Sequence, residues 1–184
     1  MASVTSRDAT PAPDRPSPWL SRLARDRKLR YFFDQVPPGA TILELGCADG
    51  WVGRWAARHG HRVLGVDVRP PADIVGDIRA WRSLGLPEHG FDVIIAFEVL
   101  EHGEFSEVLY DLLEPDGRLM VTTPVPRLDW ACRIGEAAGV LQRRTSPHSH
   151  LLDVRRMPHF VVVERRIVGL VSQWAVLRPV RAAP

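Results

Sequence analysis

The sequence predicts an α/β fold with a mostly parallel sheet, and three observations lead to this prediction. First, short apolar runs of strand length, such as Ile42–Leu45, Arg62–Val66 and Phe91–Phe97, alternate with segments of helical spacing. Second, a polar or acidic residue lies near the carboxyl end of each run, where open parallel sheets bind ligands. Third, Phe160–Ile167 and Val171–Leu177 flank a glycine, which predicts a final hairpin and one antiparallel strand.

Helices are expected between these strands. The first, over Trp19–Val36, has an apolar stripe at helical spacing and is stopped by two prolines and a glycine. A short third strand over Ala72–Gly76 and a fifth strand after the Pro115-Asp116-Gly117 turn complete the alternation. The remaining helices are expected over Trp51–His59, Ala80–Leu84 and Phe105–Leu113.

The passage from the first strand into the next helix has the pattern of a ligand-binding turn. It reads Ile42-Leu43-Glu44-Leu45-Gly46-Cys47-Ala48-Asp49-Gly50, and its small residues at Gly46, Ala48 and Gly50 leave room for a ligand close to the backbone. Seventeen residues after Gly50, Asp67 ends the second strand, where an acidic side chain can accept hydrogen bonds from both ribose hydroxyls. Together the two features predict a nucleoside-binding site at this edge of the sheet.

Length and composition fit one globular domain in a reducing compartment. The chain has 184 residues, of which 45% are hydrophobic and 25% charged. It contains no apolar stretch near the roughly 20 residues that a membrane helix needs, no secretion signal, and two cysteines without disulfide or metal-binding spacing. We therefore expect a cytoplasmic protein, with residues 1–17 as a disordered tail and residues 18–184 as a single domain.

Charge is unevenly distributed along the chain. Residues 1–117 carry 13 basic and 18 acidic side chains, a net charge of −5, and residues 118–184 carry 11 basic and four acidic ones, a net charge of +7. This asymmetry is compatible with an anionic substrate, nucleic acid or a membrane surface, and equally with solvated arginines in a chain that uses few lysines. Much of the basic half is the segment 125–158, which we expect to be a substrate-side insertion or lid.

Taken together, the motifs resemble those of the class I S-adenosylmethionine-dependent methyltransferases. ILELGCADG is similar to the first motif of that family, GVDV to the second, VGDI to the third and FDVIIAFEVLEH to the fourth, and LEPDGRLMVTTP is similar to its turn and fifth strand. A nicotinamide-binding protein would share the first two motifs but not EVLEH or LEPDG. The resemblance implies a Rossmann-like sheet of seven strands in the order 3-2-1-4-5-7-6 with helices on both faces, and S-adenosylmethionine as the cofactor.

The resemblance also implies which residues bind that cofactor. Glu44 and the glycine loop would hold its methionine end, and Asp67 would hold the ribose. Asp77 and Ile78 would flank the adenine. The full expected set, of which the last two would lie below the transferred methyl group, is Glu44, Gly46, Cys47, Ala48, Asp49, Gly50, Asp67, Val68, Asp77, Ile78, Phe97 and Glu98.

The segment Glu98-Val99-Leu100-Glu101-His102 leaves three routes open for the chemistry. Its two carboxylates and imidazole, together with the later His150, resemble the metal site of ExxEH-bearing family members and would suit Mg²⁺ or Mn²⁺. Alternatively, a histidine acts as general base without a metal, and the candidates are His102, His148 and His150. The third route is catalysis by proximity alone, as with an amine acceptor.

We expect a methyltransferase that acts on a small-molecule metabolite at a hydroxyl oxygen. ExxEH resembles two branches of the family, the ubiquinone-biosynthesis O-methyltransferases and the small-RNA 2′-O-methyltransferases, and Leu128–His150 is similar in length and character to the insertion of the first. The alternatives are an RNA ribose 2′-O-methyltransferase and a non-catalytic cofactor-binding accessory domain. The insertion could also contact membrane lipid, and no pattern indicates an oligomeric state. The RNA alternative would use Arg127, Arg133, Arg143 and Arg144.

Overall fold

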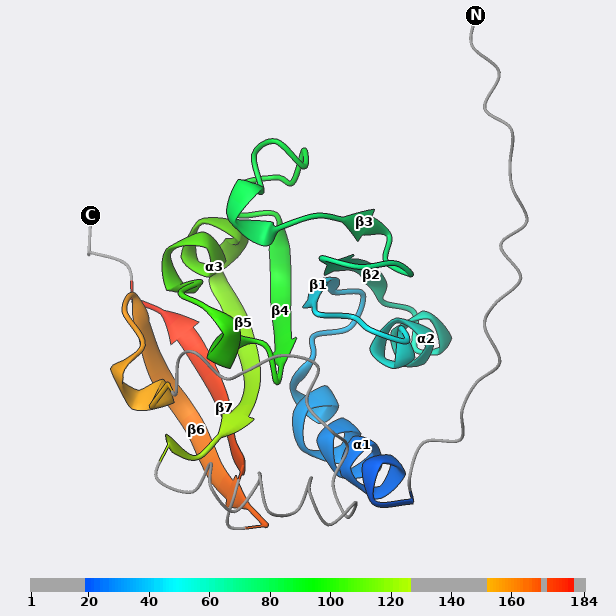
Figure 1. Ribbon diagram of the computed structural model, residues 1–184, viewed down its shortest axis with the longest axis vertical. Helices are drawn as coiled ribbons and strands as arrows, with labels where there is room; N and C mark the ends of the chain where they lie inside the picture. The colour runs from blue at the N-terminus through cyan, green and yellow to red at the C-terminus, as the bar shows by residue number, and fades with distance from the viewer. Residues whose placement is uncertain (1–18, 127–151, 170–171, 181–184) are drawn as a thin grey trace, which may run out of the picture.

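A seven-stranded sheet forms the centre of the molecule (Figure 1). The structure is a computed structural model, and it describes residues 19–126, 152–169 and 172–180. The strands lie in the order β3-β2-β1-β4-β5-β7-β6, and β7 runs antiparallel to both of its neighbours. The predicted strand order and terminal hairpin are therefore confirmed. The strands are β1 (Thr41–Leu45), β2 (Arg62–Asp67), β3 (Ile74–Val75), β4 (Phe91–Phe97), β5 (Leu113–Pro124), β6 (Phe160–Val168) and β7 (Ser172–Pro179).

Most of the predicted helices form, and one does not. The prediction of a helix over Ala80–Leu84 is wrong, because only a 3₁₀ turn, η2, lies there. The Asp77 side chain accepts the Arg79 N–H at its start, and Gly85 ends the following turns with φ of +73°. In the described ranges no helix is long and apolar enough to cross a membrane. The helices are α1 (Trp19–Phe32), η1 (Phe33–Gln35), α2 (Trp51–Arg58), η2 (Ile78–Ala80), η3 (Leu100–His102), α3 (Ser106–Leu112) and η5 (Val154–Arg156).

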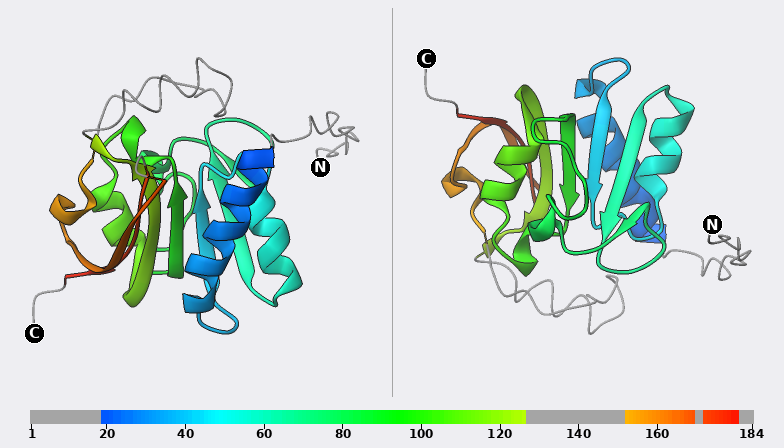
Figure 2. Two further views of the ribbon diagram at one scale, coloured as in Figure 1. Left: turned by 90° about the horizontal axis from the view of Figure 1, so that it is seen from below. Right: turned by 90° about the horizontal axis from the view of Figure 1, so that it is seen from above.

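Alternate residues of the central strands supply two hydrophobic layers, one on each face of the sheet. On one face, Ile42 and Ile95 pack with residues of α1, η1 and α2, such as Phe32 and Val52. On the other face, Leu43 and its neighbours pack with α3, η2 and η5. Figure 2 shows α1 and α2 near each other, with α3 apart from them. This alternation is what a strand buried on both faces requires.

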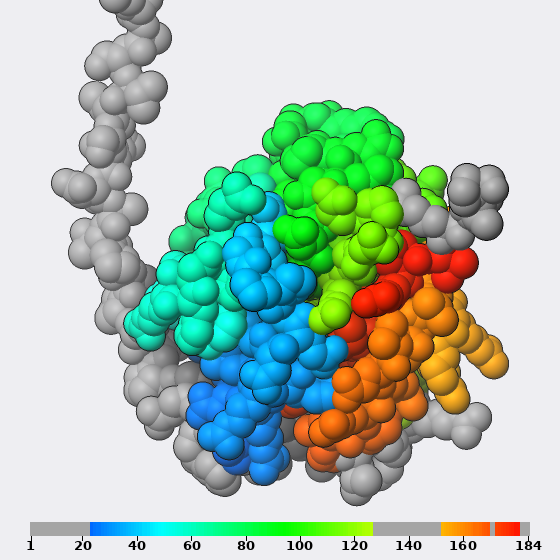
Figure 3. All heavy atoms as spheres, turned by 180° about the vertical axis from the view of Figure 1, so that it is seen from behind, coloured from blue at the N-terminus to red at the C-terminus, as the bar shows by residue number. Residues whose placement is uncertain are grey.

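The order of the strands reverses at β1, which has β2 on one side and β4 on the other. In open α/β sheets the ligand cleft lies outside the carboxyl ends of the strands at such a switch point. Helix α1 lies along one face of the sheet (Figure 2), and its Lys28 contacts Phe97 and Glu98 at the carboxyl end of β4. It also contacts β6, since Gln35 beyond its end donates to Glu164 at 3.2 Å and Arg166 lies over the Tyr31 ring; Figure 3 shows the two elements side by side.

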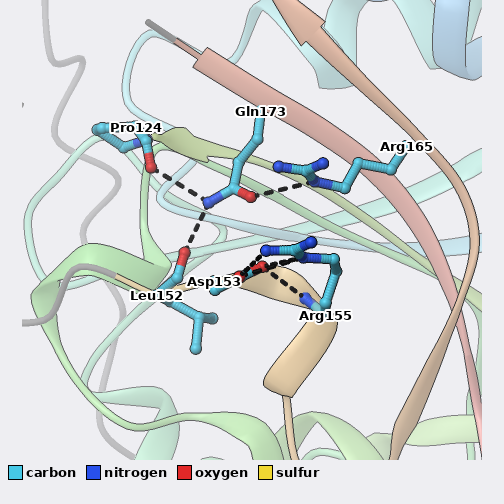
Figure 4. Close-up of polar contacts among 6 residues, drawn as sticks. All are labelled: Pro124, Leu152, Asp153, Arg155, Arg165 and Gln173. Carbon is cyan, nitrogen blue, oxygen red and sulfur yellow. Dashed lines mark hydrogen bonds and ion pairs between the residues drawn. The ribbon is translucent and has the colours of Figure 1, made fainter. Parts of the chain in front are cut away.

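One buried glutamine connects β5 with Leu152, where the described chain resumes within the predicted lid segment 125–158. The Gln173 side chain is fully buried on β7, and its amide donates to the carbonyl of Pro124 at 3.2 Å and to that of Leu152 at 2.6 Å (Figure 4). Its carbonyl accepts from Arg165 at 3.4 Å. The two ends of the segment 127–151, which lies outside the described residues, are thus fastened to the sheet through one side chain.

Candidate active site at the carboxyl edge of the sheet

The glycine loop after β1 is a tight turn that brings two distant motifs together. Gly46 has φ of +66° and its N–H donates to the carbonyl of Val66 at 2.9 Å. A Cβ at Gly46 would lie 2.6 Å from Val99 Cγ2, so this glycine is needed for the close approach of the segment after β4 as well as for its backbone angle. Gly50 has φ of +67° and starts α2. The fold itself therefore requires glycine at Gly46 and favours it at Gly50, whether or not a ligand binds.

Asp67 connects the end of β2 to the glycine loop. Its Oδ2 accepts the N–H of Ala48 at 3.2 Å, and its Oδ1 accepts the N–H of Arg69 at 3.1 Å. Ala48 itself has φ of 45°, a left-handed angle that costs energy in a residue other than glycine. A carboxylate offers about four lone-pair sites, so these two bonds leave Asp67 able to accept from a bound diol. The next residue, Val68, is 66% exposed at the same edge.

Two carboxyl groups, those of Glu44 and Asp49, lie behind the loop. Glu44 is buried on β1, and burial raises its pKa to about 8, an effect that the Gly53 N–H partly offsets and that the charges of Asp49 and Asp73 increase. Asp49 Oδ2 lies 2.9 Å from Arg25 Nη1 of α1, while its Oδ1 is buried without a hydrogen-bond partner among the described residues. The unpaired Asp49 oxygen can accept a hydrogen bond from an ammonium group, and a cation placed beside Glu44 would favour the ionised form of its carboxyl.

A hollow of about 500 Å³ lies under the loop and contains part of the predicted cofactor set. Glu44, Asp49 and Gly50 line it, and Asp73 closes one side by accepting the Gly65 N–H at 2.7 Å. Its volume is within the roughly 300–1,000 Å³ of small-ligand pockets. The side chain of Cys47, also in its lining, is buried against Gly65, so burial raises its pKa to about 11.

A second hollow of about 510 Å³ lies at the opposite edge of the sheet. Trp55, His59 and His61 line it, and none of the predicted site residues does. Size alone does not separate the two hollows. The motif residues and the unpaired carboxylate oxygen distinguish the one under the glycine loop.

The predicted adenine-binding pair is arranged differently from the expectation. Both oxygens of Asp77 are bonded to the guanidinium and N–H of Arg79, two residues later, which lowers the pKa of Asp77. The side chain of Ile78 is buried in the hydrophobic core. Hydrogen bonding of Asp77 to an adenine amine stays a prediction, and it would have to occur alongside this ion pair.

Phe97 and Glu98 end and follow β4, and a lysine from α1 lies against both. Lys28 Nζ lies 3.3 Å from Glu98 Oε1 and 5.0 Å from the centre of the Phe97 ring. Thr122 of β5 donates its hydroxyl to the same Glu98 oxygen at 2.8 Å. Glu98 has φ of 58° although it is not glycine. Such backbone angles persist only where the surroundings hold them, and they are frequent at functional sites.

Two of the ExxEH carboxyl groups, Glu98 and Glu101, lie near enough for their charges to interact. Glu101 is 1% exposed and accepts from Thr123 at 3.3 Å; burial and then the charge of Glu98 raise its pKa to about 8. His102 lies on η3 with its side chain exposed. No group of three or more His, Cys, Asp or Glu side chains suited to a metal is found among the described residues. His148 and His150 lie outside those residues, so the metal set and the histidine bases stay predictions.

Sequence reasoning missed the residues that reach the site from other elements. These are Arg25 and Lys28 of α1, Thr122 of β5, and Asp73 between β2 and β3. No local motif marks them, because each acts through a contact with a residue distant in the chain. The one available signal for Lys28 was its type, since it is the single lysine of the sequence.

A family model described as a methyltransferase domain matches residues 18–161. A ubiquinone biosynthesis O-methyltransferase of Xylella fastidiosa is 30% identical over 115 residues, which are 52% of this chain and 47% of the relative. A 2-methyl-6-phytyl-1,4-hydroquinone methyltransferase of Synechocystis is 26% identical over 148 residues, 71% of this chain and 45% of the relative. The chain thus spans about half the length of these curated relatives.

Solved structures agree in fold. The N-methyltransferase NodS from Bradyrhizobium japonicum, in complex with S-adenosyl-L-homocysteine, superposes with a TM-score of 0.61 at 20% sequence identity, and the match covers 94% of each chain. At this identity the likeness concerns the architecture of the sheet and its helices.

Proposed function

The chain belongs to the methyltransferase domain family, and we propose that it transfers the methyl group of S-adenosylmethionine to a hydroxyl oxygen of a small-molecule acceptor. The observation that carries the proposal is the Ala48–Asp67 bond, by which the glycine loop and the acid at the end of β2 form one preformed surface. A loop of this kind beside an acidic residue is suited to a nucleoside with a free ribose diol.

Different residues at this edge would bind different parts of the cofactor. Asp67 would accept from the ribose hydroxyls, and Glu44 with Asp49 would face the cationic methionine end. S-adenosylmethionine supplies an activated methyl group on a sulfonium. The protein then has mainly to align the acceptor oxygen and exclude competing orientations. His102, His148 and His150 are the candidate bases for the acceptor proton.

An oxygen acceptor is supported by the relatives rather than by the cofactor side of the site. One relative is named for O-methylation in ubiquinone biosynthesis and another for a hydroquinone. The first name states transfer to oxygen, and the second states a hydroquinone as the acceptor without naming the atom that is methylated. We therefore propose a phenol-class small molecule, with Val125–Pro158 forming part of the acceptor side.

Methyl transfer to a defined panel of acceptors tests the proposal. The full chain would be incubated with methyl-labelled S-adenosylmethionine and, in parallel, a catechol, a hydroquinone, an arylamine and a short RNA, and the methylated atom identified by mass spectrometry and NMR. O-methylation of the phenols that disappears in Asp67→Ala is expected. Exclusive N-methylation would refute the oxygen acceptor. RNA methylation lost on neutralising Arg127, Arg133, Arg143 and Arg144 would support the RNA alternative, and cofactor binding without transfer to any acceptor would support the accessory-domain alternative.

A further inference from the structure

Lys28 is the single lysine among 24 basic side chains, and it lies at the carboxyl edge of the sheet. Its ammonium contacts Glu98 at 3.3 Å and lies 5.0 Å from the centre of the Phe97 ring. Glu98 is 70 residues away in the sequence. Helix α1 therefore places one compact positive charge where β4 ends.

The Lys28 side chain is largely buried, but its ammonium retains hydrogen-bonding capacity. The Lys28 side chain is 13% exposed, so its charge must be balanced locally, and Glu98 and the face of the Phe97 ring provide that balance. In the described ranges Glu98 is the sole hydrogen-bond acceptor of Lys28. An ammonium has three N–H donors, so two of them can bind a ligand.

The carboxylate that holds Lys28 is itself fixed. Glu98 accepts from the Thr122 hydroxyl at 2.8 Å, and its backbone N–H donates to the Thr122 carbonyl at 2.7 Å. Its left-handed φ of 58° costs energy, and these two bonds hold the backbone in that conformation. The lysine thus rests on a rigid support, as a residue that orients a substrate needs to.

The position of α1 relative to the cofactor residues assigns Lys28 to the acceptor side. Arg25, which shares a face of the helix with Lys28 at a spacing of three, contacts Asp49 of the glycine loop at 2.9 Å. Lys28 instead contacts Phe97 and Glu98 at the end of β4, and Thr122 of β5 bonds the same Glu98 carboxylate. Because the glycine loop and Asp67 hold the cofactor on the β1–β2 side, an acceptor has to approach from the β4–β5 side, where Lys28 lies.

We propose that Lys28 recognises the methyl acceptor, and that the acceptor presents an acidic oxygen to its ammonium. The inference rests on the proposed function and names its substrate class: a phenol-class hydroxyl, whose negative form a nearby cation favours, in preference to an amine, whose cationic form Lys28 repels. A lysine suits this role because its charge is compact, whereas the broad planar guanidinium of arginine would not occupy the same space between Glu98 and Phe97.

The single lysine permits a direct test by NMR. Protein labelled with ¹³C at the lysine ε-carbon gives one side-chain signal, which can be followed in the presence of saturating S-adenosylhomocysteine, so that no turnover occurs. Titration with 3,4-dihydroxybenzoate is expected to shift this signal, and titration with benzylamine is expected to leave it unchanged. Absence of a shift with that probe, with catechol and with hydroquinone would overturn the proposal.

Three variants separate recognition of the acceptor from general effects. In Lys28→Gln, affinity for 3,4-dihydroxybenzoate should fall about tenfold or more, in line with loss of a hydrogen bond to a charged group, while affinity for S-adenosylhomocysteine stays within a factor of about two. Lys28→Arg should recover part of the affinity. Arg27→Gln, which removes a charge from an exposed position of the same helix, should change neither.

The outcomes distinguish this inference from the proposed function. Unchanged probe affinity in Lys28→Gln would refute the role of Lys28 even if the enzyme methylates phenols. Equal loss of probe and S-adenosylhomocysteine affinity would also refute it, because the residue would then support the site as a whole. Failure of methyl transfer to oxygen, with probe binding still dependent on Lys28, would refute the proposed reaction alone.

Discussion

The two halves of the ligand-binding edge are built in different ways. In the cofactor half, at the ends of β1 and β2, carboxylates accept mainly from backbone N–H groups: Asp67 bonds Ala48 and Asp73 bonds Gly65. One side-chain pair, Arg25 with Asp49, reaches this half from α1. In the acceptor half, at the ends of β4 and β5, side chains contact side chains. Glu98 meets Lys28 across 70 residues and Thr122 across 24.

This difference explains why one half is general and the other specific. A backbone-made surface depends on small residues and turn geometry, so it can recur wherever the same cofactor is used. A surface made by side chains from α1, β4 and β5 can change its charge with single substitutions and leave the turn intact. We therefore expect changes in the cofactor half to abolish binding of the common ligand and changes in the acceptor half to alter stability or acceptor choice.

The largest expected effect is on cofactor binding in Asp67→Ala. The substitution would remove the acceptor that we propose for the ribose hydroxyls, and it also removes the acceptor of the Ala48 N–H. Loss of two hydrogen bonds to a charged group corresponds to about 3 to 4 kcal/mol, or roughly 200- to 1,000-fold in Kd. Isothermal titration calorimetry with S-adenosylhomocysteine measures it.

Asp77→Ala is the matched control for that experiment. Both Asp77 oxygens already bind Arg79, so the carboxylate has less capacity for a ligand, and we expect a loss of about tenfold or less. An Asp77→Ala loss equal to that of Asp67→Ala would mean that the Arg79 pair opens on binding and that the adenine contact is as strong as the ribose contact.

In the acceptor half, Gln173→Leu tests the attachment of the two chain ends beside the lid. The variant leaves the carbonyls of Pro124 and Leu152 without their shared donor. Burial of two unpaired acceptors should lower the free energy of unfolding by about 2 to 3 kcal/mol, measured by urea denaturation. Affinity for S-adenosylhomocysteine should be unchanged.

Asp153→Ala provides the comparison for Gln173→Leu. Asp153 pairs with Arg155 near the same place, but the arginine side chain is 64% exposed, and we expect a loss of about 1 kcal/mol or less. Weaker cofactor binding in Gln173→Leu would show that the cofactor half and the acceptor half are coupled through β5 and do not act independently.

The same division sets how much the sequence could predict. The strands themselves, the glycine loop and the position of Asp67 follow from local patterns, because apolar runs and their terminal polar residues are encoded in short segments. The order of the strands came from the resemblance to the methyltransferase family, since short segments do not specify which strands become neighbours. The helix expected at Ala80–Leu84 failed because the Asp77 side chain bonds the Arg79 backbone and starts a 3₁₀ turn, a competition that propensity does not reveal. Lys28 and Gln173 escaped prediction since their partners are contiguous only in the folded chain.

An effect no larger than that of Gln173→Leu concerns Glu44, whose burial in the cofactor half lowers stability at high pH. Burial raises the pKa of Glu44 to about 8, so the folded protein binds a proton that the unfolded chain releases above its ordinary pKa of about 4.5. The free energy of unfolding is therefore unaffected below the ordinary pKa, falls as pH rises from the ordinary pKa to the folded pKa, and is lowest once pH exceeds the folded pKa. Glu44→Gln removes this penalty, so it should match wild type near pH 4.5 and exceed it by about 2 kcal/mol near pH 8.

The full linkage value is larger, but the hollow under the glycine loop lets water reach the carboxyl and reduces the cost. Urea denaturation of both proteins across this pH range, without cofactor, measures the difference, and Glu88→Gln, which alters an exposed carboxylate away from the site, controls for net charge. A constant difference at all pH values would contradict the burial of a neutral Glu44. Weaker cofactor binding by Glu44→Gln, despite its greater stability, would show that the Glu44 carboxyl lowers stability but contributes to binding the cationic end of the ligand.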